Sequence, residues 1–202
     1  NIDSLDNLSN VPKGSVLVAV PYTDYTNEDL ATIKGFVDGG GTLLLMDDYG
    51  YGNTILTYLG VAARFTGKPL LDPIFNYKNH WLPQITDLVP RVRQSGIGTI
   101  TLDHATAMTN VKPGMEIAWA SGASFLDMNG NGSWDEGEPT GPFVVAAEFR
   151  LGKGTLTLVS DPSIMINSML GRDDNDHFME YLTNVEGEQN KILVDSSHLI
   201  KA

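Results

Sequence analysis

Twelve consecutive residues, 127–138, have the composition and spacing of a calcium-binding loop. The segment reads DMNGNGSWDEGE and fits the pattern D-x-[DN]-x-[DN]-G-x5-E at every defined position. Calcium takes about six to eight oxygen ligands, and a loop of this kind supplies them at alternating positions, ending in a bidentate glutamate. The predicted ligands are Asp127, Asn129, Asn131, Ser133 through its backbone carbonyl, Asp135 through a water molecule, and Glu138.

The sequences on both sides of this loop indicate a structural role for calcium. EIAWASGASFL before it and PTGPFVVAAEF after it read as strands, so the two helices of a signalling EF-hand are not expected. Gly132 permits the sharp turn, and we expect Trp134 to pack inward. The alternative is an Asn-Gly turn with solvated charges, although a turn alone needs no glutamate at the twelfth position. Calcium is therefore the predicted cofactor.

A second group of polar residues follows the predicted strands and the turns after them. Open α/β sheets bind ligands in the crevice at the carboxyl ends of their strands, so such residues could line one pocket. The same residue types also cap helices, and both interpretations stay open at this point. The candidate pocket residues are Asp47, Asp48, Asn53, Asp161, Asn167, Asn175, Asp195 and His198.

Two alternative functions use other combinations of side chains. A hydrolase acting through Asp48, Asp161 and Asp195 predicts a deep pocket and at least one carboxyl group with a shifted pKa. A carbohydrate-binding module acting through Trp81 and Tyr77 predicts that these rings are exposed and coplanar. The four histidines have no H-x-H or H-E-x-x-H spacing, so the sequence does not predict a transition-metal site.

The composition restricts the classes of partner. The chain has 202 residues, of which 42% are hydrophobic, and its 13 Lys and Arg against 25 Asp and Glu give a net charge of -12. A nucleic acid would be bound against this charge, so nucleic-acid binding is not expected. No stretch approaches the roughly 18 apolar residues of a membrane span. Because the chain opens on Asn1, we expect an excised segment or mature product, with any membrane attachment through segments outside it.

The order of predicted elements indicates a doubly wound α/β sheet. SVLVAV (15–20) reads as a strand buried on both faces, and residues 26–41 read as a helix with a capping box at Thr26 and Asp29. TLLLM (42–46) follows as a second strand, which completes a crossover unit with parallel strands. Gly152 to Gly154 predicts a hairpin turn between two later strands, before a short helix and a last strand, KILVD.

Two segments of the sequence resemble a known family. FVDGGGTLLLMDDYGYGNTILTYLG and LGKGTLTLVSDPSIMINSMLGRDDNDHFMEYL resemble the class I glutamine amidotransferase-like domains (domain of unknown function 4350 type) of archaeal and bacterial surface or membrane-anchored proteins. The resemblance covers about two thirds of the chain and implies a flavodoxin-like, amidotransferase-like α/β sandwich with a mostly parallel sheet. The chain has no Cys, however, so the nucleophile of true amidotransferases is missing.

Together these features predict one α/β domain over residues 1–202, with a less regular β-rich insertion at about 62–150 that carries the calcium loop 127–138. We expect a non-catalytic, calcium-stabilised binding or scaffolding domain of a membrane-associated protein, with a protein or glycan partner. A calcium site of this type suits the millimolar calcium outside cells, so we expect an extracellular or cell-surface location.

Overall fold

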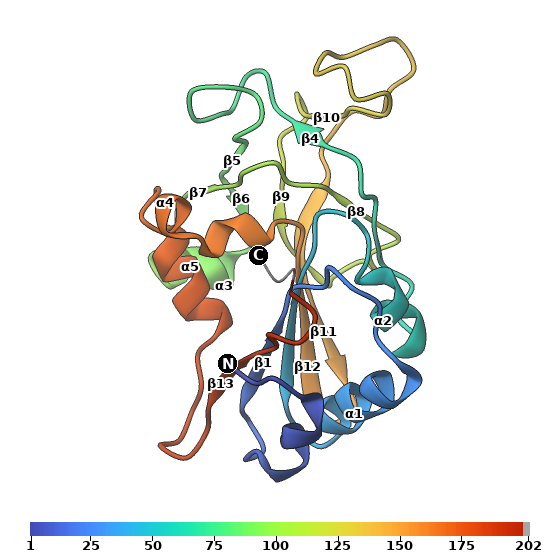
Figure 1. Ribbon diagram of the computed structural model, residues 1–202. Coiled ribbons are helices and arrows are strands. Elements are labelled where there is room, and N and C mark those ends of the chain that lie inside the picture. Colours follow the sequence, from blue (N-terminus) through green and yellow to red (C-terminus); the bar gives the residue numbers. More distant parts are fainter. Residues whose placement is uncertain (200–202) are drawn as a thin grey trace.

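The central feature of the fold is one nine-stranded sheet between two layers of helices and loops, seen in the computed structural model (Figure 1). The structure describes residues 1–199. The strand order is β13-β1-β2-β12-β11-β8-β3, while β9 pairs with β11 and with β6. The strands of this sheet are β1 (Val16–Ala19), β2 (Thr42–Met46), β3 (Arg64–Phe65), β6 (Asp87–Leu88), β8 (Met108–Thr109), β9 (Glu116–Trp119), β11 (Val144–Leu151), β12 (Gly154–Val159) and β13 (Ile192–Val194).

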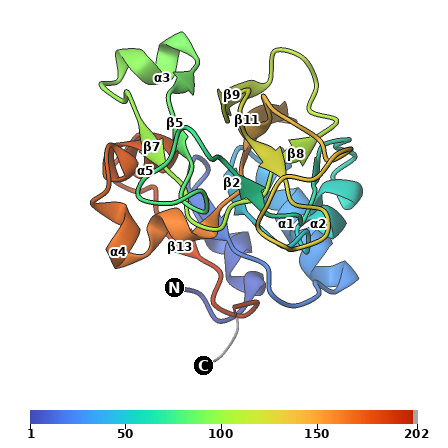
Figure 2. The ribbon, with the colours of Figure 1, turned by 90° about the horizontal axis from the view of Figure 1, so that it is seen from above.

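Helices cover both faces of this sheet, with α1 and α2 on one side and α3, α4 and α5 on the other (Figures 1 and 2). Two small antiparallel sheets lie beyond it: β4 (Leu70–Leu71) with β10 (Phe125–Leu126), and β5 (Gln84–Ile85) with β7 (Ile100–Thr101). The α-helices are α1 (Asn27–Asp38), α2 (Asn53–Tyr58), α3 (Pro90–Gln94), α4 (Asn167–Leu170) and α5 (Asn175–Leu182), and the 3-10 helices are η1 (Leu5–Asn10) and η2 (Pro162–Met165).

The core of the sheet is parallel, as the sequence predicts. β13, β1, β2 and β12 run in one direction, and α1 forms the crossover between β1 and β2. Beyond β12 the pairings are antiparallel, starting with the predicted hairpin of β11 and β12. The prediction of an α/β fold is therefore confirmed, and the sheet is mixed, with a parallel core.

Successive residues of the central strands face opposite layers, because side chains alternate along a strand. In β1, Val16 and Val18 belong to the core under α3 and α5, whereas Leu17 and Ala19 belong to the core under α1 and α2. All four residues are buried. β1 is thus covered on both faces, which explains its continuous apolar sequence.

The first helix has the ends that the sequence predicts. The hydroxyl of Thr26 accepts a hydrogen bond from the backbone N–H of Asp29, and the carboxylate of Asp29 accepts one from the N–H of Thr26. This capping box satisfies two donors that the first turn of a helix leaves free. Leu30, Ile33 and Val37 then pack onto the sheet.

Residues 62–150 add strands to the main sheet and also build its outer rim. β3, β8, β9 and most of β11 lie in this segment, as do the two small sheets and the loop 127–138, which projects at the upper right of Figure 1. Over the part of the chain that the structure describes, no helix is long and apolar enough to cross a membrane.

One prediction tests the tight packing of β12 against α1. A Cβ at Gly154 would overlap the carbonyl oxygens of Val37 and Gly41, whereas a Cβ at Gly35, within α1, would meet nothing within 4 Å. We expect Gly154→Ala to lower the free energy of unfolding by about 1–3 kcal/mol. Gly35→Ala should raise it by about 0.5–1 kcal/mol, because alanine favours a helix over glycine. Urea unfolding measures both, and equal stability of the two variants would contradict this packing.

Candidate functional site

The predicted pocket residues divide between two faces of the sheet and do not form one pocket. Asp47 and Asp195 make their contacts on the side of α1 and α2, with the turn before α2 and with Tyr25 before α1. Asp48 and Asp161 lie near each other on the opposite side, where the backbone of Asp103 contacts Asp161. Asp195 thus makes different contacts from Asp48 and Asp161, and the combination of these three acids in one hydrolase site stays a prediction.

Asp47 organises the turn that leads into α2. One carboxylate oxygen accepts hydrogen bonds from the backbone N–H groups of Tyr49 (2.8 Å) and Gly50 (2.9 Å), and the other accepts one from Gly52 (2.6 Å). Burial raises the pKa of Asp47, although these hydrogen bonds act in the opposite direction. Asp47 thus binds the backbone of the turn before α2, whose N-cap is Gly52 and has no side-chain capping bond.

The three asparagines are separated from one another. Asn53 binds the backbone N–H and carbonyl of Phe65 and so holds β3. Asn175 is fully buried, and its amide binds both backbone groups of Thr101 and the carbonyl of Met169. Asn167 is exposed at the start of α4. Two of these side chains therefore connect segments of backbone.

Asp161 and Asp48 form a pair of carboxyl groups with raised pKa values. Asp161 is fully buried and accepts hydrogen bonds from the N–H groups of Ser163 and Asp103, both at 2.7 Å. Burial raises its pKa to about 7, and the nearby Asp48 adds to the effect. Burial also raises the pKa of Asp48 to about 6. One oxygen of Asp48, Oδ1, is buried and has no hydrogen-bond partner.

A cleft of about 210 Å³ opens beside Asp48. The ring of Trp81 stacks on His104 at its wall, with ring centres 5.0 Å apart and an angle of 22° between the rings. His104 has a φ of +54° and binds Asp103 through Nδ1. The cleft is lined by Asp48, Tyr49, Gly67, Pro69, Trp81, His104 and Ala105.

Sequence reasoning found only part of this cleft. Asp48 was a candidate because it follows a strand, but Tyr49, His104 and Pro69 lie in irregular segments that carry no periodic pattern. Their convergence depends on the path of residues 66–72 and 102–106, which the hydrogen bonds from Leu70 to Ala105 and from Thr66 to Ala107 fix. The one local feature of the sequence that points to this cleft is the carboxylate of Asp103 next to His104.

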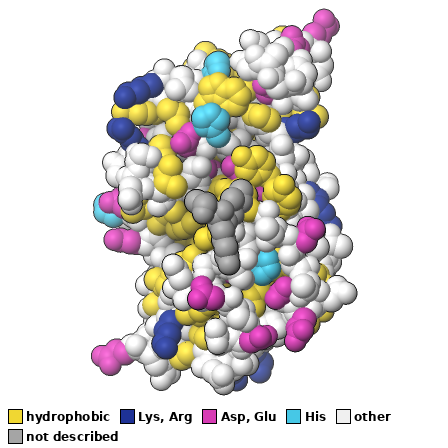
Figure 3. Space-filling view, viewed as in Figure 1, with side chains coloured by type: hydrophobic (Ala, Val, Ile, Leu, Met, Phe, Trp, Pro, Cys, Tyr) yellow, Lys and Arg dark blue, Asp and Glu magenta, His cyan; other side chains and the backbone are white. Residues whose placement is uncertain are grey.

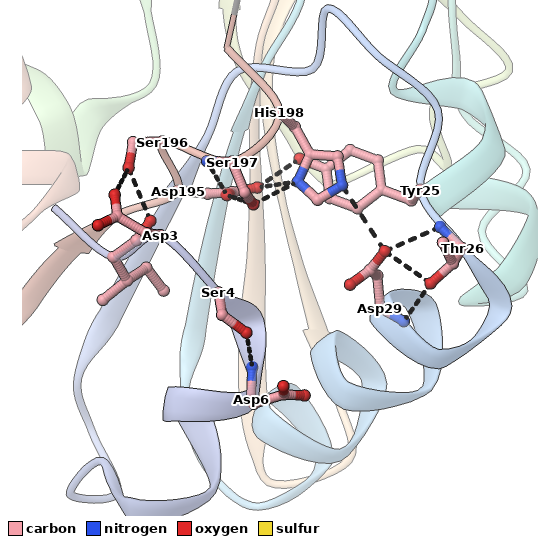
Figure 4. Close-up of polar contacts among 11 residues, drawn as sticks. Asp3, Ser4, Asp6, Tyr25, Thr26, Asp29, Asp195, Ser196, Ser197 and His198 are labelled. Atoms are coloured by element: carbon pink, nitrogen blue, oxygen red, sulfur yellow. Dashed lines mark hydrogen bonds and ion pairs between the residues drawn. The ribbon is translucent and has the colours of Figure 1, made fainter.

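Asp195 and His198 belong to a separate polar cluster, the 195–198 cluster (Figure 4). His198 Nδ1 lies 2.7 Å from Asp195 Oδ2 and 2.9 Å from the Ser197 hydroxyl. The hydroxyl of Tyr25 donates to Asp195 at 2.9 Å, and the Tyr25 ring stacks on His198 with centres 3.7 Å apart. His198 Nε2 lies 3.7 Å from Asp29. The cluster thus joins the segment after β13 to the start of α1.

This cluster does not have the geometry of a catalytic triad. In a triad the histidine contacts the nucleophile through one ring nitrogen and the acid through the other. Here Ser197 and Asp195 both contact Nδ1. Burial raises the pKa of Tyr25, and Asp195 adds to it, so the phenol stays protonated and keeps donating. Ser196 adds a bond to Asp3, which ties the segment to the N-terminal end of the chain (Figure 4).

In the predicted calcium loop, the first residue is almost completely buried. Asp127 Oδ1 accepts hydrogen bonds from the backbone N–H groups of Gly130 (2.6 Å) and Asn131 (3.2 Å), and Oδ2 accepts one from Gly132 (2.7 Å). Burial favours protonation, but these hydrogen bonds outweigh it and lower the pKa of Asp127. The loop is therefore wrapped around an ionised carboxylate.

The last residue of the loop closes it. Glu138 accepts hydrogen bonds from the backbone of Met128 (2.7 Å) and Asp135 (3.0 Å), one on each carboxylate oxygen. The side-chain NH2 groups of Asn129 and Asn131 both donate to Asp135 Oδ2 at 2.7 Å. Five of the six predicted ligand side chains and backbone groups thus take part in one network within the loop.

The structure agrees with the expectation for Gly132 in the loop and disagrees with the expectation for Trp134. Gly132 has a φ of +76°, as its place at the sharp turn requires. Trp134 is 53% exposed, so the expectation that it packs inward is wrong. The ring of Trp81, from a segment distant in sequence, lies close to Gly132 of the loop. Within residues 1–199, no three His, Cys, Asp or Glu side chains gather in a metal-binding cluster.

The rings proposed for a carbohydrate-binding platform do not lie together on the surface. Trp81 is partly buried and stacks on His104. Tyr77 is partly buried, and the guanidinium of Arg172 lies 4.5 Å from its ring centre and donates to its hydroxyl. The expected pair of exposed, coplanar rings is therefore wrong.

A family model matches residues 1–183. The chain belongs to the family described as Domain of unknown function (DUF4350). This confirms the DUF4350 part of the resemblance, while the origin in a surface or membrane-anchored protein stays a prediction. No curated protein matches the DUF4350 chain.

Solved structures with a similar fold include the mmIFT52 N-terminal domain, at 15% identity and a TM-score of 0.69, over 92% of this chain and 82% of that chain. The match shows that the DUF4350 domain shares this fold. A beta-galactosidase from Bacillus circulans sp. alkalophilus matches at 13% identity and a TM-score of 0.44, over 73% of this chain and 20% of that chain. The exo-beta-1,4-mannosidase Op5Man5 from Opitutaceae bacterium strain TAV5 matches at 14% identity and a TM-score of 0.41, over 88% of this chain and 27% of that chain.

The raised pKa values of Asp48 and Asp161 predict how stability depends on pH. An unfolded aspartate has a pKa near 3.8, against about 6 and 7 for these groups in the fold. The folded protein therefore holds more protons than the unfolded chain between these values, and the free energy of unfolding falls as the pH rises from about 4 to about 7. Asp48→Asn removes part of this dependence.

Denaturant unfolding at several pH values measures the effect, with the exposed Asp24→Asn as the matched control. Asp48→Asn should lose less stability than the wild type as the pH rises, whereas Asp24→Asn should follow the wild type. A wild-type-like pH dependence in Asp48→Asn would contradict the assignment.

The buried amide of Asn175 gives a second prediction. Asn175→Ala leaves the backbone groups of Thr101 and the carbonyl of Met169 without this partner, so we expect a loss of about 2–4 kcal/mol in the free energy of unfolding. Asn167→Ala, on the exposed start of α4, is the control and should change it by less than about 0.5 kcal/mol. Similar losses in both variants would refute the structural role of Asn175.

Proposed function

We propose that this domain is a calcium-stabilised binding or scaffolding module that carries out no catalysis. It works outside the cell or at its surface, as part of a membrane-associated protein held by segments beyond this chain. The observation that carries the proposal is the loop 127–138, in which buried Asp127 and closing Glu138 organise a run of backbone N–H groups.

The donor set of the loop suits calcium. Hard cations prefer oxygen, and the loop offers three carboxylates, two carboxamides and the backbone carbonyl of Ser133 at the required spacing. The NH2 groups of Asn129 and Asn131 now meet on Asp135. Asp127, Asn129, Asn131, Ser133, Asp135 and Glu138 would hold a calcium ion through their oxygen atoms. The ion would supply the positive charge that these oxygens lack.

The position of the loop in the fold explains why bound calcium would stabilise the domain and would not switch it between two conformations. Asp127 follows β10 directly, and its N–H donates to the carbonyl of Pro69 beside β4. Strands therefore flank the loop, and no helix pair stands beside it to open. Calcium binding would hold the β4–β10 pair and the rim of the domain in place.

The proposed location outside the cell follows from the calcium affinity that we expect of such a site. Extracellular modules bind calcium at roughly 10⁻⁴ to 10⁻³ M, which matches millimolar calcium outside cells and exceeds the calcium of the cytosol. The net charge of -12 also opposes binding to nucleic acid. A protein or glycan partner at the surface fits both features.

The non-catalytic role rests on what the polar residues do. The chain contains no Cys, so it lacks the nucleophile of amidotransferases. Asp47, Asn53 and Asn175 bind backbone groups, and Asp195 belongs to the cluster that joins the end of the domain to α1. These side chains support the fold that would present a binding surface.

Calcium titration of chelator-stripped protein tests this proposal. We expect one ion to bind by calorimetry. Stability should rise as RT ln(1 + [Ca]/Kd), about 2.7 kcal/mol when calcium is about 100 times the Kd. Glu138→Gln should lose most of the gain, because the amide supplies one oxygen and no charge where the carboxylate supplies two oxygens.

Glu136→Gln is the matched control, since Glu136 is exposed in the same loop at a position that is not a predicted ligand. It should bind and be stabilised like the wild type. No heat and no stabilisation of the wild type at millimolar calcium would overturn the proposal, as would equal losses in the two variants.

A further inference from the structure

The cleft beside Asp48 combines a carboxylate with aromatic walls. Asp48 and Tyr49 come from the turn after β2, while Trp81 and His104 come from two segments of the outer rim. The volume of about 210 Å³ is smaller than the roughly 300–1,000 Å³ of pockets for whole drug-sized ligands. The cleft is therefore large enough for the head group of a ligand or for one side chain of a partner.

The carboxylate at this cleft lacks a partner. Asp48 Oδ1 is buried, and no group of the described residues donates a hydrogen bond to it. A buried acceptor without a donor is costly, so such a group usually has a partner in the working state. Oδ1 itself is enclosed by the protein, so a donor in the cleft reaches the carboxylate through its other oxygen.

No ion pair within the described residues balances the charge here, although the charge of a protonated His104 acts to lower the pKa of Asp48. Among residues 1–199, none of the ion pairs includes Asp48 or Asp161, and His104 is paired with Asp103. Asp47, Asp48 and Asp161 are all close enough to raise the pKa of Tyr22, which burial and these acids bring to about 12. The local field is therefore negative, as is the net charge of the chain.

We propose that this cleft binds an organic cation, an ammonium or guanidinium group that donates to the carboxylate of Asp48 and lies against the rings of Trp81 and Tyr49. Such a group supplies both a donor and a positive charge, and cations are attracted to the faces of aromatic rings. The inference deepens the proposed binding function and rests on it, because it names the chemical class of the ligand.

Two other ligand classes fit less well. A metal ion needs several converging ligands, whereas Asp48 is the one carboxylate among the described residues that line the cleft. A neutral sugar could stack on Trp81, but it would leave the charge of the buried carboxylate unbalanced. The organic cation satisfies both the carboxylate and the rings.

The calcium loop forms the support behind one wall of the cleft. A Cβ at Gly132 would lie 3.6 Å from the Trp81 ring, so the loop backbone packs directly against that ring. The cleft and the loop are still separate sites with different ligand residues. Binding at each can be measured independently of the other.

The test uses calorimetry at about pH 8, where an Asp48 with a pKa of about 6 is ionised. The probes are N-acetyl-glycyl-arginyl-glycinamide, its lysine counterpart and its neutral citrulline counterpart, with free agmatine and glucose as further arms. Each is titrated with millimolar calcium and again with chelator. The proteins are the wild type, Asp48→Asn and Asp24→Asn, which removes the same charge from an exposed position.

The proposal predicts that the arginine or lysine peptide binds the wild type and Asp24→Asn equally, and Asp48→Asn about tenfold more weakly or less. The citrulline peptide should not bind. Agmatine binding as tightly as the peptide would assign the site to free amines, and tighter peptide binding would assign it to a basic side chain of a partner. Equal affinity of wild type and Asp48→Asn, no binding of any cation, or Asp48-dependent binding of glucose alone would overturn it.

The two calcium conditions separate this inference from the proposed function. If the loop binds no calcium but the cations still bind through Asp48, the calcium part of the proposal fails and the cleft stands. If calcium binds and stabilises but no cation binds, the cleft assignment fails and the calcium-stabilised module stands.

Discussion

The parallel pairing of β1, β2 and β12 determines where every polar residue after these strands points. Leu17 pairs with Leu43, and Leu43 with Leu156, so three neighbouring residues send their side chains to one face together. Asp47 and Asp48 continue this alternation beyond β2 and make contacts on opposite faces. The sheet thus separates Asp47, which binds the backbone of a turn, from Asp48, which lines a cleft.

This separation explains why acids of similar sequence context behave differently. Asp47 and Asp161 receive backbone N–H groups, which reduce the energetic cost of burying them. Asp48 has one oxygen without a partner, and Asp195 is held by Tyr25 and Ser197. Asp47, Asp161 and Asp195 are buried, whereas Asp48 is partly buried, lines a cleft and has one oxygen without a hydrogen-bond partner.

The sequence was sufficient for the elements with strong local patterns. The strands at 15–20 and 42–46, the capping box of Thr26 and Asp29, and the turn between β11 and β12 were all predicted, because each depends on neighbouring residues. The cleft was not predicted as a whole, since Trp81 and His104 reach Asp48 through irregular segments without periodicity. The expectation for Trp134 was wrong, since its side chain is exposed, and the contact of Trp81 with the loop at Gly132 was not predicted because it joins segments distant in sequence.

The central claim is that the loop 127–138 binds calcium and thereby supports the rim of the domain, including the Trp81 wall of the cleft. A crystal structure of calcium-soaked protein, with anomalous diffraction collected at a long wavelength, tests this most directly. The account predicts one anomalous peak surrounded by oxygens of Asp127, Asn129, Asn131, Ser133 and Glu138, with Asp135 reached directly or through a water. A loop without a peak, in which both asparagine NH2 groups still donate to Asp135, would contradict it.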